Sequence, residues 1–440
     1  METKEFMEKK ISSFNWQLSL KVITIGLIGL VLMVPKMMIL GLIHEREQTA
    51  ESARHEVMQK WSLEQTVRGP VLTIPYLEKV PGPDGKEIRE EIHQCHFLPD
   101  SLYIEGTLNP QELHRGIYQS VVYQSNITIR GRFARPDFSG IKVNPANVLW
   151  DKAQLSLAIS DLRGIDARTD LNWNSQSIPF SPGMDNKLLG DNGISLTLPG
   201  QTAKDFPANF QLSLKLKGSD ALQFAPLGET TEVKLQSIWN APGFTGNFLP
   251  ANRTISQKGF NAYWKILNYN RNFPQAWKDN EFKVTDADFG VQLVTLADHY
   301  QKSYRSAKYG ILVILFLFLS FFLNETITKR RIHPFQYILV GFAILIFYLL
   351  LLSISEQLGF DTAYLIAAVS VLALVFAYSL TFLKTWLNAA LLTAILAFSF
   401  GFIFILMQLE SYALLVGSVG LFCVLALTMF FTRKINWYGE

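Results

Sequence analysis

The side chains best suited to metal binding or nucleophilic attack gather in one place, where His93, Cys95 and His96 lie within four residues of one another. In a β-strand, residues 93 and 95 share one face and residue 96 points to the other, so a shared metal ion requires a bulge or turn. The sequence offers no second cluster to supply a fourth ligand. We therefore favour polar strand residues and a lone thiol. A metal site and a hydrolase built on these three residues stay open as alternatives.

Other signatures of catalysis are missing from the sequence. It contains no Gly-x-Ser-x-Gly, no phosphate-binding loop, no dinucleotide fingerprint and no His-Glu-x-x-His. Paired carboxylates, Glu90 with Glu91 and Asp286 with Asp288, lie in polar, turn-like surroundings and are expected on solvated surface. We predict a protein that is not an enzyme, with no catalytic residue, cofactor or metal.

The composition excludes two large classes of protein. Of the 440 residues, 49% are hydrophobic and 18% are charged, whereas soluble proteins carry about a quarter charged residues. The last third of the chain is almost continuously apolar, which excludes a wholly soluble or a disordered protein. The net charge of +3, without a basic stripe, excludes a nucleic-acid partner. Cys95 and Cys423 lie in a polar and an apolar region, and we expect no disulfide between them.

Apolar stretches that approach the roughly 20 residues needed to cross a bilayer occur six times. They are residues 22–43, 309–324, 335–353, 362–383, 387–408 and 413–431. The first is interpreted as an uncleaved anchor, because no small-x-small cleavage site follows it. The short loops between the last five predict a five-helix bundle over residues 309–431.

Basic residues occur only in alternate loops of this pattern, which orients the protein by the positive-inside rule. They are Lys329, Arg330 and Arg331, then Lys384, and finally Arg433 and Lys434. Both termini, residues 1–21 and 432–440, are therefore predicted to be cytoplasmic in a bacterial inner membrane. Residues 44–308 are then periplasmic.

Inside the first span, Pro35 precedes Lys36. One interpretation is a buried charge on a transport pathway. We favour the other, a kink followed by a lysine that extends toward the outer interface. Spans three to six carry no ionisable residue at their centres, which argues against a charged transport site.

The periplasmic segment is predicted to be rich in β-strands. Residues 44–60 have helical character and extend the first span as a stalk. Beyond residue 71 hydrophobic and polar residues alternate, as at 127–133, 155–159, 194–198 and 210–216. This indicates a large all-β, sandwich-like antiparallel domain inserted between helices 1 and 2, with a helical stretch near residues 263–278. Residues 127–137 and 210–220 are faintly alike, which leaves open whether the domain has one or two lobes.

Several segments of the chain resemble the CreD family of bacterial inner-membrane proteins, described as cell-envelope integrity proteins. They are residues 69–75 (GPVLTIP), 161–165 (DLRGI), 246–250 (GNFLP), 325–326 (ET), 332–341 (IHPFQYILVG), 347–353 (FYLLLLS) and 430–438 (FFTRKINWY). The resemblance spans essentially the whole chain. It implies an inner-membrane protein tied to envelope integrity and envelope stress, in some bacteria under a two-component regulator. It carries no established catalytic residue.

Within the longest of these segments, Pro334 is placed to begin a helix as a first-turn residue. Glu325, His333 and Gln336 are then expected to cap or bridge two helices at the cytoplasmic face. We favour this structural role over a ligand site.

Three functions compete on the sequence. The favoured one is a non-enzymatic envelope protein whose β-domain binds a periplasmic or inner-membrane protein, a lipid or a glycan. The second is a lipid or small-molecule transporter or flippase accessory acting through the bundle. It predicts a cavity lined by Ser353, Ser355, Tyr364 or Ser399. The third is the hydrolase described above. In each case the lipid bilayer is a partner, and the oligomeric state stays open.

Overall fold

The computed structural model describes residues 16–81, 88–293, 299–328, 331–383, 385–409 and 412–433. Several residues on which the orientation prediction depends (Lys329, Arg330, Lys384 and Lys434) lie outside this described part. The chain divides into two compact units. The helical unit comprises Met1–Glu51 and Ala297–Glu440, and the β-unit comprises Ser52–Leu296.

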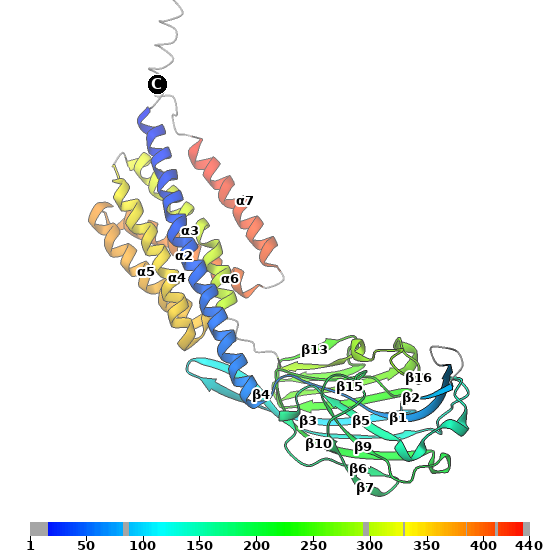
Figure 1. Ribbon diagram of the computed structural model, residues 1–440. Coiled ribbons are helices and arrows are strands. Elements are labelled where there is room, and N and C mark those ends of the chain that lie inside the picture. Colours follow the sequence, from blue (N-terminus) through cyan, green and yellow to red (C-terminus); the bar gives the residue numbers. More distant parts are fainter. Residues whose placement is uncertain are drawn as a thin grey trace, which may run out of the picture. The chain divides into compact units, whose positions relative to one another are not determined.

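The helical unit contains long helices (Figure 1), most of which are apolar. Its helices are α2 (Trp16–Trp61), α3 (His299–Thr328), α4 (Pro334–Leu358), α5 (Phe360–Leu383), α6 (Trp386–Gln408) and α7 (Ala413–Thr432). Within the described residues, five of them, α2 to α6, are long and apolar enough to cross a membrane. In α7 the apolar stretch is shorter, Leu415–Phe430.

The helix α2 lies antiparallel to α3. Lys21 pairs with Glu325 near one end, and Lys36 Nζ donates to the carbonyl oxygen of Lys308 at 3.1 Å near the other. Lys36 is 6% exposed, because a backbone carbonyl of α3 is within reach and satisfies the ammonium group inside the protein. That carbonyl belongs to Lys308, at the predicted outer end of the second span, so a lysine that extends toward the outer interface stays a prediction.

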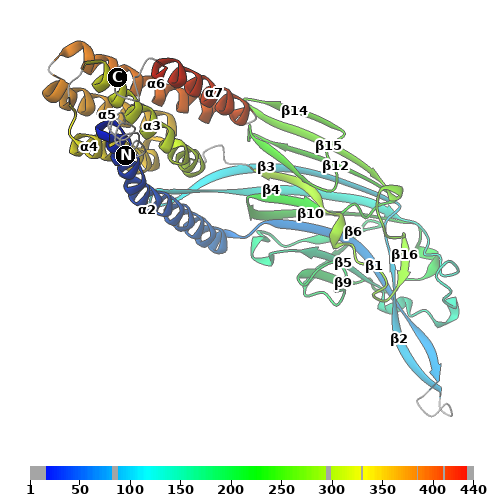
Figure 2. The ribbon, with the colours of Figure 1, turned by 90° about the horizontal axis from the view of Figure 1, so that it is seen from above.

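The β-unit consists of two sheets, of nine and eight described strands (Figure 2). The first sheet runs in the order β13 (Pro242–Gly246), β17 (Phe289–Leu293), β11 (Ala221–Phe224), β1 (Gln65–Pro81), β5 (Gln154–Ile159), β9 (Gly193–Thr197) and β8 (Ser181–Pro182), with β2 (Ile88–Phe97) paired to β1 and β16 (Ala276–Lys278) paired to β2. The second runs in the order β14 (Asn252–Ser256), β15 (Gly259–Leu267), β12 (Thr230–Ser237), β3 (Ser101–Arg115), β4 (Tyr118–Phe133), β10 (Ala208–Ser219), β6 (Asp170–Trp173) and β7 (Gln176–Pro179).

One hydrophobic core takes side chains from both sheets. Val71 and Leu155 come from the first, and Ile129 and Leu214 from the second. The strands predicted from alternation are confirmed as β4, β5, β9 and β10. In β10 the burial alternates strictly from Ala208 to Leu216, because one face packs on the core and the other faces water.

Two expectations about this domain need correction, and the question of one or two lobes has an answer. Residues 263–278 are not helical: β15 continues to Leu267, a 3₁₀ turn follows at Asn268–Asn270, and β16 comes next. Alternation between buried Trp264 and outward Lys265 sets a period of two there. The pairing is not wholly antiparallel, since β1–β11 and β3–β12 are parallel. The two similar segments are adjacent strands, β4 and β10, of one sheet in a single unit.

The first and last strands of the β-unit lie close together. β1 follows α2 in sequence, β17 precedes α3, and β11 lies between them. Gln65 of β1 is opposite Leu222 of β11, which in turn is opposite Val291 of β17. Because β17 is antiparallel to β11, the start of β1 and the end of β17 are at the same end of the sheet.

Candidate functional site

The residues of the His-Gln-Cys-His segment lie on β2 but do not converge on one point. His93 Nδ1 is 2.8 Å from Asp279 Oδ2, whereas Cys95 is fully buried in the core. His96 is 1% exposed, with its Nδ1 3.0 Å from Thr73 Oγ1. Within the described ranges, no group of three or more His, Cys, Asp or Glu side chains is arranged to hold a metal ion.

Burial dominates the chemistry of Cys95 and His96. It raises the pKa of the Cys95 thiol to about 12 and lowers the pKa of His96 to about 4. Asn186 Nδ2 lies 3.2 Å from His96 Nδ1, and the imidazole packs against Trp277 with ring centroids 5.7 Å apart. A thiol that stays protonated is a poor nucleophile. This pair is therefore suited to the core of the domain.

One of the paired carboxylates expected on the surface is part of a buried ion pair. Asp288 accepts Arg68 Nε at 2.9 Å and Arg68 Nη2 at 2.5 Å. The Arg68 and Asp288 side chains are 17% and 15% exposed. Burial raises the pKa of the Asp288 carboxyl even though Arg68 opposes that change. The prediction of solvated carboxylates is wrong for Asp288, while Glu90, Glu91 and Asp286 are exposed.

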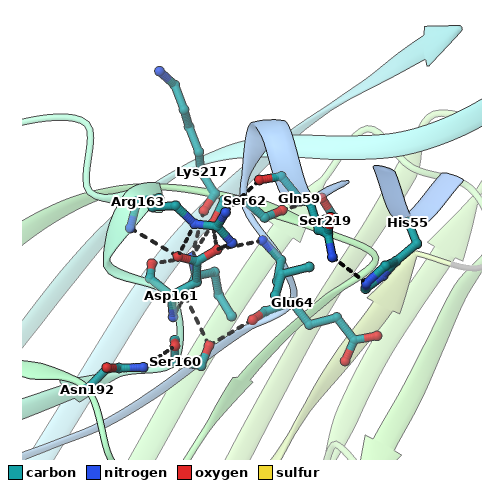
Figure 3. A network of polar contacts seen from close by, with 12 residues as sticks. His55, Gln59, Ser62, Glu64, Ser160, Asp161, Arg163, Asn192, Lys217 and Ser219 are labelled. Atoms are coloured by element: carbon teal, nitrogen blue, oxygen red, sulfur yellow. Dashed lines mark hydrogen bonds and ion pairs between the residues drawn. The ribbon is translucent and has the colours of Figure 1, made fainter. Parts of the chain in front are cut away.

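The Asp-Leu-Arg-Gly-Ile segment forms a polar network where α2 ends and β1 begins (Figure 3). Asp161 accepts from Arg163 Nε at 2.9 Å, from the Leu63 backbone N–H at 2.9 Å and from Ser62 Oγ at 3.1 Å. Arg163 Nη1 also donates to the carbonyl oxygen of Gln59 at 2.7 Å. The network thus joins the last turn of α2 to the 3₁₀ turn Leu162–Gly164, which Asp161 caps.

The charge of Asp161 is stabilised although its side chain is almost fully buried. Burial raises the pKa of this carboxyl, but the hydrogen bonds from Arg163, Leu63 and Ser62 outweigh burial and lower the pKa to about 2. Gly164 completes the arrangement because a Cβ there would overlap the carbonyl oxygen of Lys217. The glycine of this segment is therefore required by space.

The four residues predicted as a motif lie around the junction of α3 and α4. His333 is the N-cap of α4: its Nδ1 accepts from the Phe335 N–H at 3.2 Å, and Gln336 Oε1 accepts from the His333 N–H at 3.1 Å. Pro334 is at the first helical position. Glu325, near the end of α3, pairs with Lys21 of α2 and does not contribute to the cap.

An open cavity of about 610 Å³ lies at this junction, within the helical unit. We call it the basic pocket. It is lined by the first turns of α2, the end of α3, the α3–α4 linker and the start of α4: Leu20, Lys21, Thr24, Ile25, Ile28, Glu325, Arg331, Ile332, His333, Pro334 and Tyr337. Three of the four predicted residues line it, and Gln336 supports it through the cap.

The hydroxyl groups predicted to line a cavity in the bundle are mostly engaged by the helices themselves. Tyr364 Oη donates to the carbonyl oxygen of Phe400 at 2.7 Å. Ser355 and Ser399 are buried and donate to carbonyl oxygens of their own helices. Ser353 is exposed.

A second open cavity, of about 660 Å³, lies on the exposed face of the eight-stranded sheet. We call it the sheet groove. Its walls are mainly polar side chains and glycine from β3, β4, β12, β14 and β15: Glu105, Gly106, Thr107, Asn126, Thr128, Lys234, Leu235, Gln236, Asn252, Arg253, Thr254, Asn261, Ala262 and Tyr263. The groove is bounded by β14, whose five residues are all exposed.

The sequence did not reveal Lys21, Arg331 and Tyr337 as parts of one pocket. In the sequence, Arg331 is one of the basic loop residues, and Tyr337 falls within the apolar span 335–353 and the family-like segment 332–341. Glu325 follows Lys21 by 304 positions, so no local spacing links them. The Pro334–Gln336 capping pattern was the one local signal, and it does mark the rim of the pocket.

Two comparisons with known proteins bear on identity. The family described as "Inner membrane protein CreD" matches residues 17–438. The chain is also 33% identical, over 415 residues, to the inner membrane protein CreD of Escherichia coli strain K12, covering 93% of this chain and 91% of that protein. Both matches extend over the helical unit and the β-unit. The resemblance of the seven quoted segments is thereby confirmed, and the chain belongs to the CreD family of inner membrane proteins.

Proposed function

We propose that the protein supports envelope integrity or the envelope-stress response without catalysis, and that its β-unit binds a periplasmic partner along β14 and the sheet groove. The observation that carries this proposal is the character of β14. It is a sheet-edge strand with all five residues exposed, beside a groove lined mainly by polar residues. An exposed edge strand presents unpaired N–H and C=O groups to which another strand can add.

The other strands at the ends of the two described sheet orders are less suited to this role. β7 contains Pro179, β8 contains Pro182 and β13 begins with Pro242. Proline cannot donate to a β-ladder, and edge strands often carry it as a defence against unwanted pairing. β14 has no proline and carries Arg253, and Lys234 and Glu105 line the adjacent groove. These features favour an extended peptide with polar side chains as the partner.

In-cell photocrosslinking tests this surface. A photoreactive amino acid in place of Thr254 on β14 is expected to capture a protein of the envelope, identified by mass spectrometry. The matched control is the same probe in place of Ser177, which is exposed on β7 at the opposite edge of the same sheet. Equal capture at both positions, or none at residue 254, contradicts the proposal.

We further propose the topology on which this function depends. The chain has six membrane spans, with α7 as the sixth: at 20 residues it falls within the roughly 17–25 residues that spanning helices use. Both termini lie in the cytoplasm, and the β-unit, inserted between the first and second spans, lies in the periplasm. The support is the alternation of basic loops along the sequence.

Cysteine labelling tests this topology. In a Cys423→Ser background, with Cys95 buried, a membrane-impermeant maleimide is expected to label Ser256→Cys in intact spheroplasts. It is expected to label Arg433→Cys only after the membrane is permeabilised. Both native positions are exposed in the structure, so accessibility differs only by compartment. The reverse pattern overturns the topology.

The competing function places the activity in the bundle as a lipid or small-molecule transporter or flippase accessory. A chain that lacks residues 62–300 distinguishes the two. If it retains the envelope phenotype while crosslinking at β14 captures nothing, the function lies in the helices.

A further inference from the structure

We propose that the helical unit holds one anionic phospholipid, with its headgroup phosphate in the basic pocket and one acyl chain in an apolar groove along α2. This inference concerns the helical unit alone and does not depend on the binding surface proposed for β14. It rests on the charges and an unpartnered hydroxyl in the pocket, on the apolar groove beside the pocket, and on the length of that groove along α2 and α3.

The basic pocket is lined by two cations, Lys21 and Arg331, and one carboxylate, Glu325. Lys21 pairs with Glu325, and the two side chains are 24% and 12% exposed. Arg331 lies close enough to Lys21 for their charges to repel. Among the residues that the structure describes, no carboxylate pairs with Arg331. A phosphate between these two cations relieves their repulsion and accepts charge-assisted hydrogen bonds.

A buried hydroxyl in the same pocket also has no partner. Tyr337 is 1% exposed and lines the cavity. Its Oη makes no hydrogen bond to any described residue, and neither does Glu325 Oε2. Buried polar atoms without partners are uncommon in native proteins, and a bound group that supplies the partner is one explanation for them. A headgroup supplies both kinds of partner: phosphate oxygens for the Tyr337 hydroxyl and hydroxyl groups for the Glu325 carboxylate.

The apolar groove begins where the basic pocket ends. Its volume is about 650 Å³, and it lies between α2, α3 and α7, lined by Val22, Ile25, Gly26, Gly29, Leu30, Met33, Ile311, Leu315, Phe318, Leu319, Phe322 and Thr428. Ile25 lines both cavities, so the two adjoin at this residue of α2. The α2 members recur at three- and four-residue spacing and therefore occupy one face of the helix.

The dimensions of the groove match one leaflet of a bilayer. From Val22 to Met33 the helix rises about 16 Å, at roughly 1.5 Å per residue, which is about half the ~30 Å hydrocarbon core. On α3 the groove extends from Ile311 to Phe322, an equal length. A phosphate at one end and an apolar channel one leaflet deep fit a phospholipid better than a free anion or a peptide.

Two glycines of α2 create the space for the chain. A Cβ added at Gly26 or at Gly29 would meet no atom within 4 Å. Side chains at these two positions therefore begin in open space beside the groove, which makes a test by substitution possible.

The experiment uses the full chain in a mild detergent, titrated with phosphatidylglycerol and observed by native mass spectrometry. We expect one retained phosphatidylglycerol per chain. The double variant Gly26→Leu/Gly29→Leu is expected to lose it. Gly41→Leu is the matched control, because Gly41 is on α2, also has open space around it and lies outside the groove. Loss in Gly41→Leu as well, or retention in the double variant, overturns the proposal.

The headgroup is tested separately. Arg331→Gln is expected to weaken phosphatidylglycerol binding about tenfold, the loss of one charge-assisted contact. Arg433→Gln, at an exposed arginine that does not line the pocket, is expected to leave binding unchanged. Glycerol phosphate, the headgroup without its chains, is expected not to compete. If it competes as well as the lipid, or if phosphatidylcholine binds equally well, an anionic phospholipid is not the ligand.

Discussion

Asp161→Asn is expected to destabilise the β-unit by roughly 2 to 3 kcal/mol at pH 7. The figure follows from the lowering of the pKa of this carboxyl from 3.8 to about 2, at about 1.4 kcal/mol for each pKa unit. Asparagine keeps the shape of the side chain and an oxygen that can still cap the turn after residue 161. The variant therefore isolates the charge that Arg163 and the Leu63 N–H recognise.

Urea denaturation of the full chain in detergent, followed by tryptophan fluorescence, measures this change. The matched control is Asp170→Asn, which removes a carboxylate paired with Arg168 at 3.0 Å on the surface. Both partners of that pair are exposed, so we expect less than about 0.5 kcal/mol. The stabilisation from Asp161 is present above pH 4 and falls as the pH drops from about 4 toward 2, because its pKa is lower in the folded state. Equal destabilisation by the two variants contradicts a special role for the network.

The β-unit is also expected to lose stability on mild acidification, through His96. Burial lowers the pKa of this imidazole from 6.5 to about 4. The unfolded chain therefore binds a proton between pH 6.5 and 4 that the folded chain does not bind. Stability then decreases as the pH falls through this range, by about 3 kcal/mol in total. Asp279 favours the protonated ring but does not outweigh burial. The contacts with Thr73 and Asn186 suit the neutral form.

His96→Gln provides the test, because glutamine cannot titrate. Urea denaturation between pH 7 and 4 is expected to show a smaller pH dependence in this variant than in the unaltered protein. His114→Gln is the control, since His114 is exposed on β3. An unchanged slope in His96→Gln shows that another group is responsible.

Local sequence patterns were sufficient to predict secondary structure where one side of a segment faces water or where its first residues cap a helix. The wet face of β10 alternates with its core face, and the span α4 begins at a proline after a capping histidine. Both features are encoded within a few residues. The wrong prediction of a helix at residues 263–278 also has a local cause. Trp264 and Ile266 of β15 are buried at a period of two, but the half-buried Tyr263 beside them makes the alternation hard to recognise in the sequence.

The parts that could not be predicted depend on residues far apart in the sequence. Asp161 accepts hydrogen bonds from Ser62 and Leu63, nearly a hundred positions earlier in the chain. The β2 strand is buried on both faces near Cys95 and His96, so no alternation marks its environment. The basic pocket forms only when the first turns of α2 come to the α3–α4 linker. No rule of sequence spacing predicts such long-range contacts, because they depend on how the helices and strands pack.

The position of β1 and β17 has a consequence for how the chain assembles. About 240 residues separate α2 from α3 in sequence, and closing a flexible loop of that length costs roughly 5 kcal/mol in entropy. With only β11 between them, the first and last strands of the β-unit lie about 10 Å apart, at some 4.8 Å per strand. That is close to the spacing of two packed helices. If the β-unit folds first, it connects α2 and α3 as a short loop would. The entropic cost of bringing the two helices together then falls by about 3 kcal/mol.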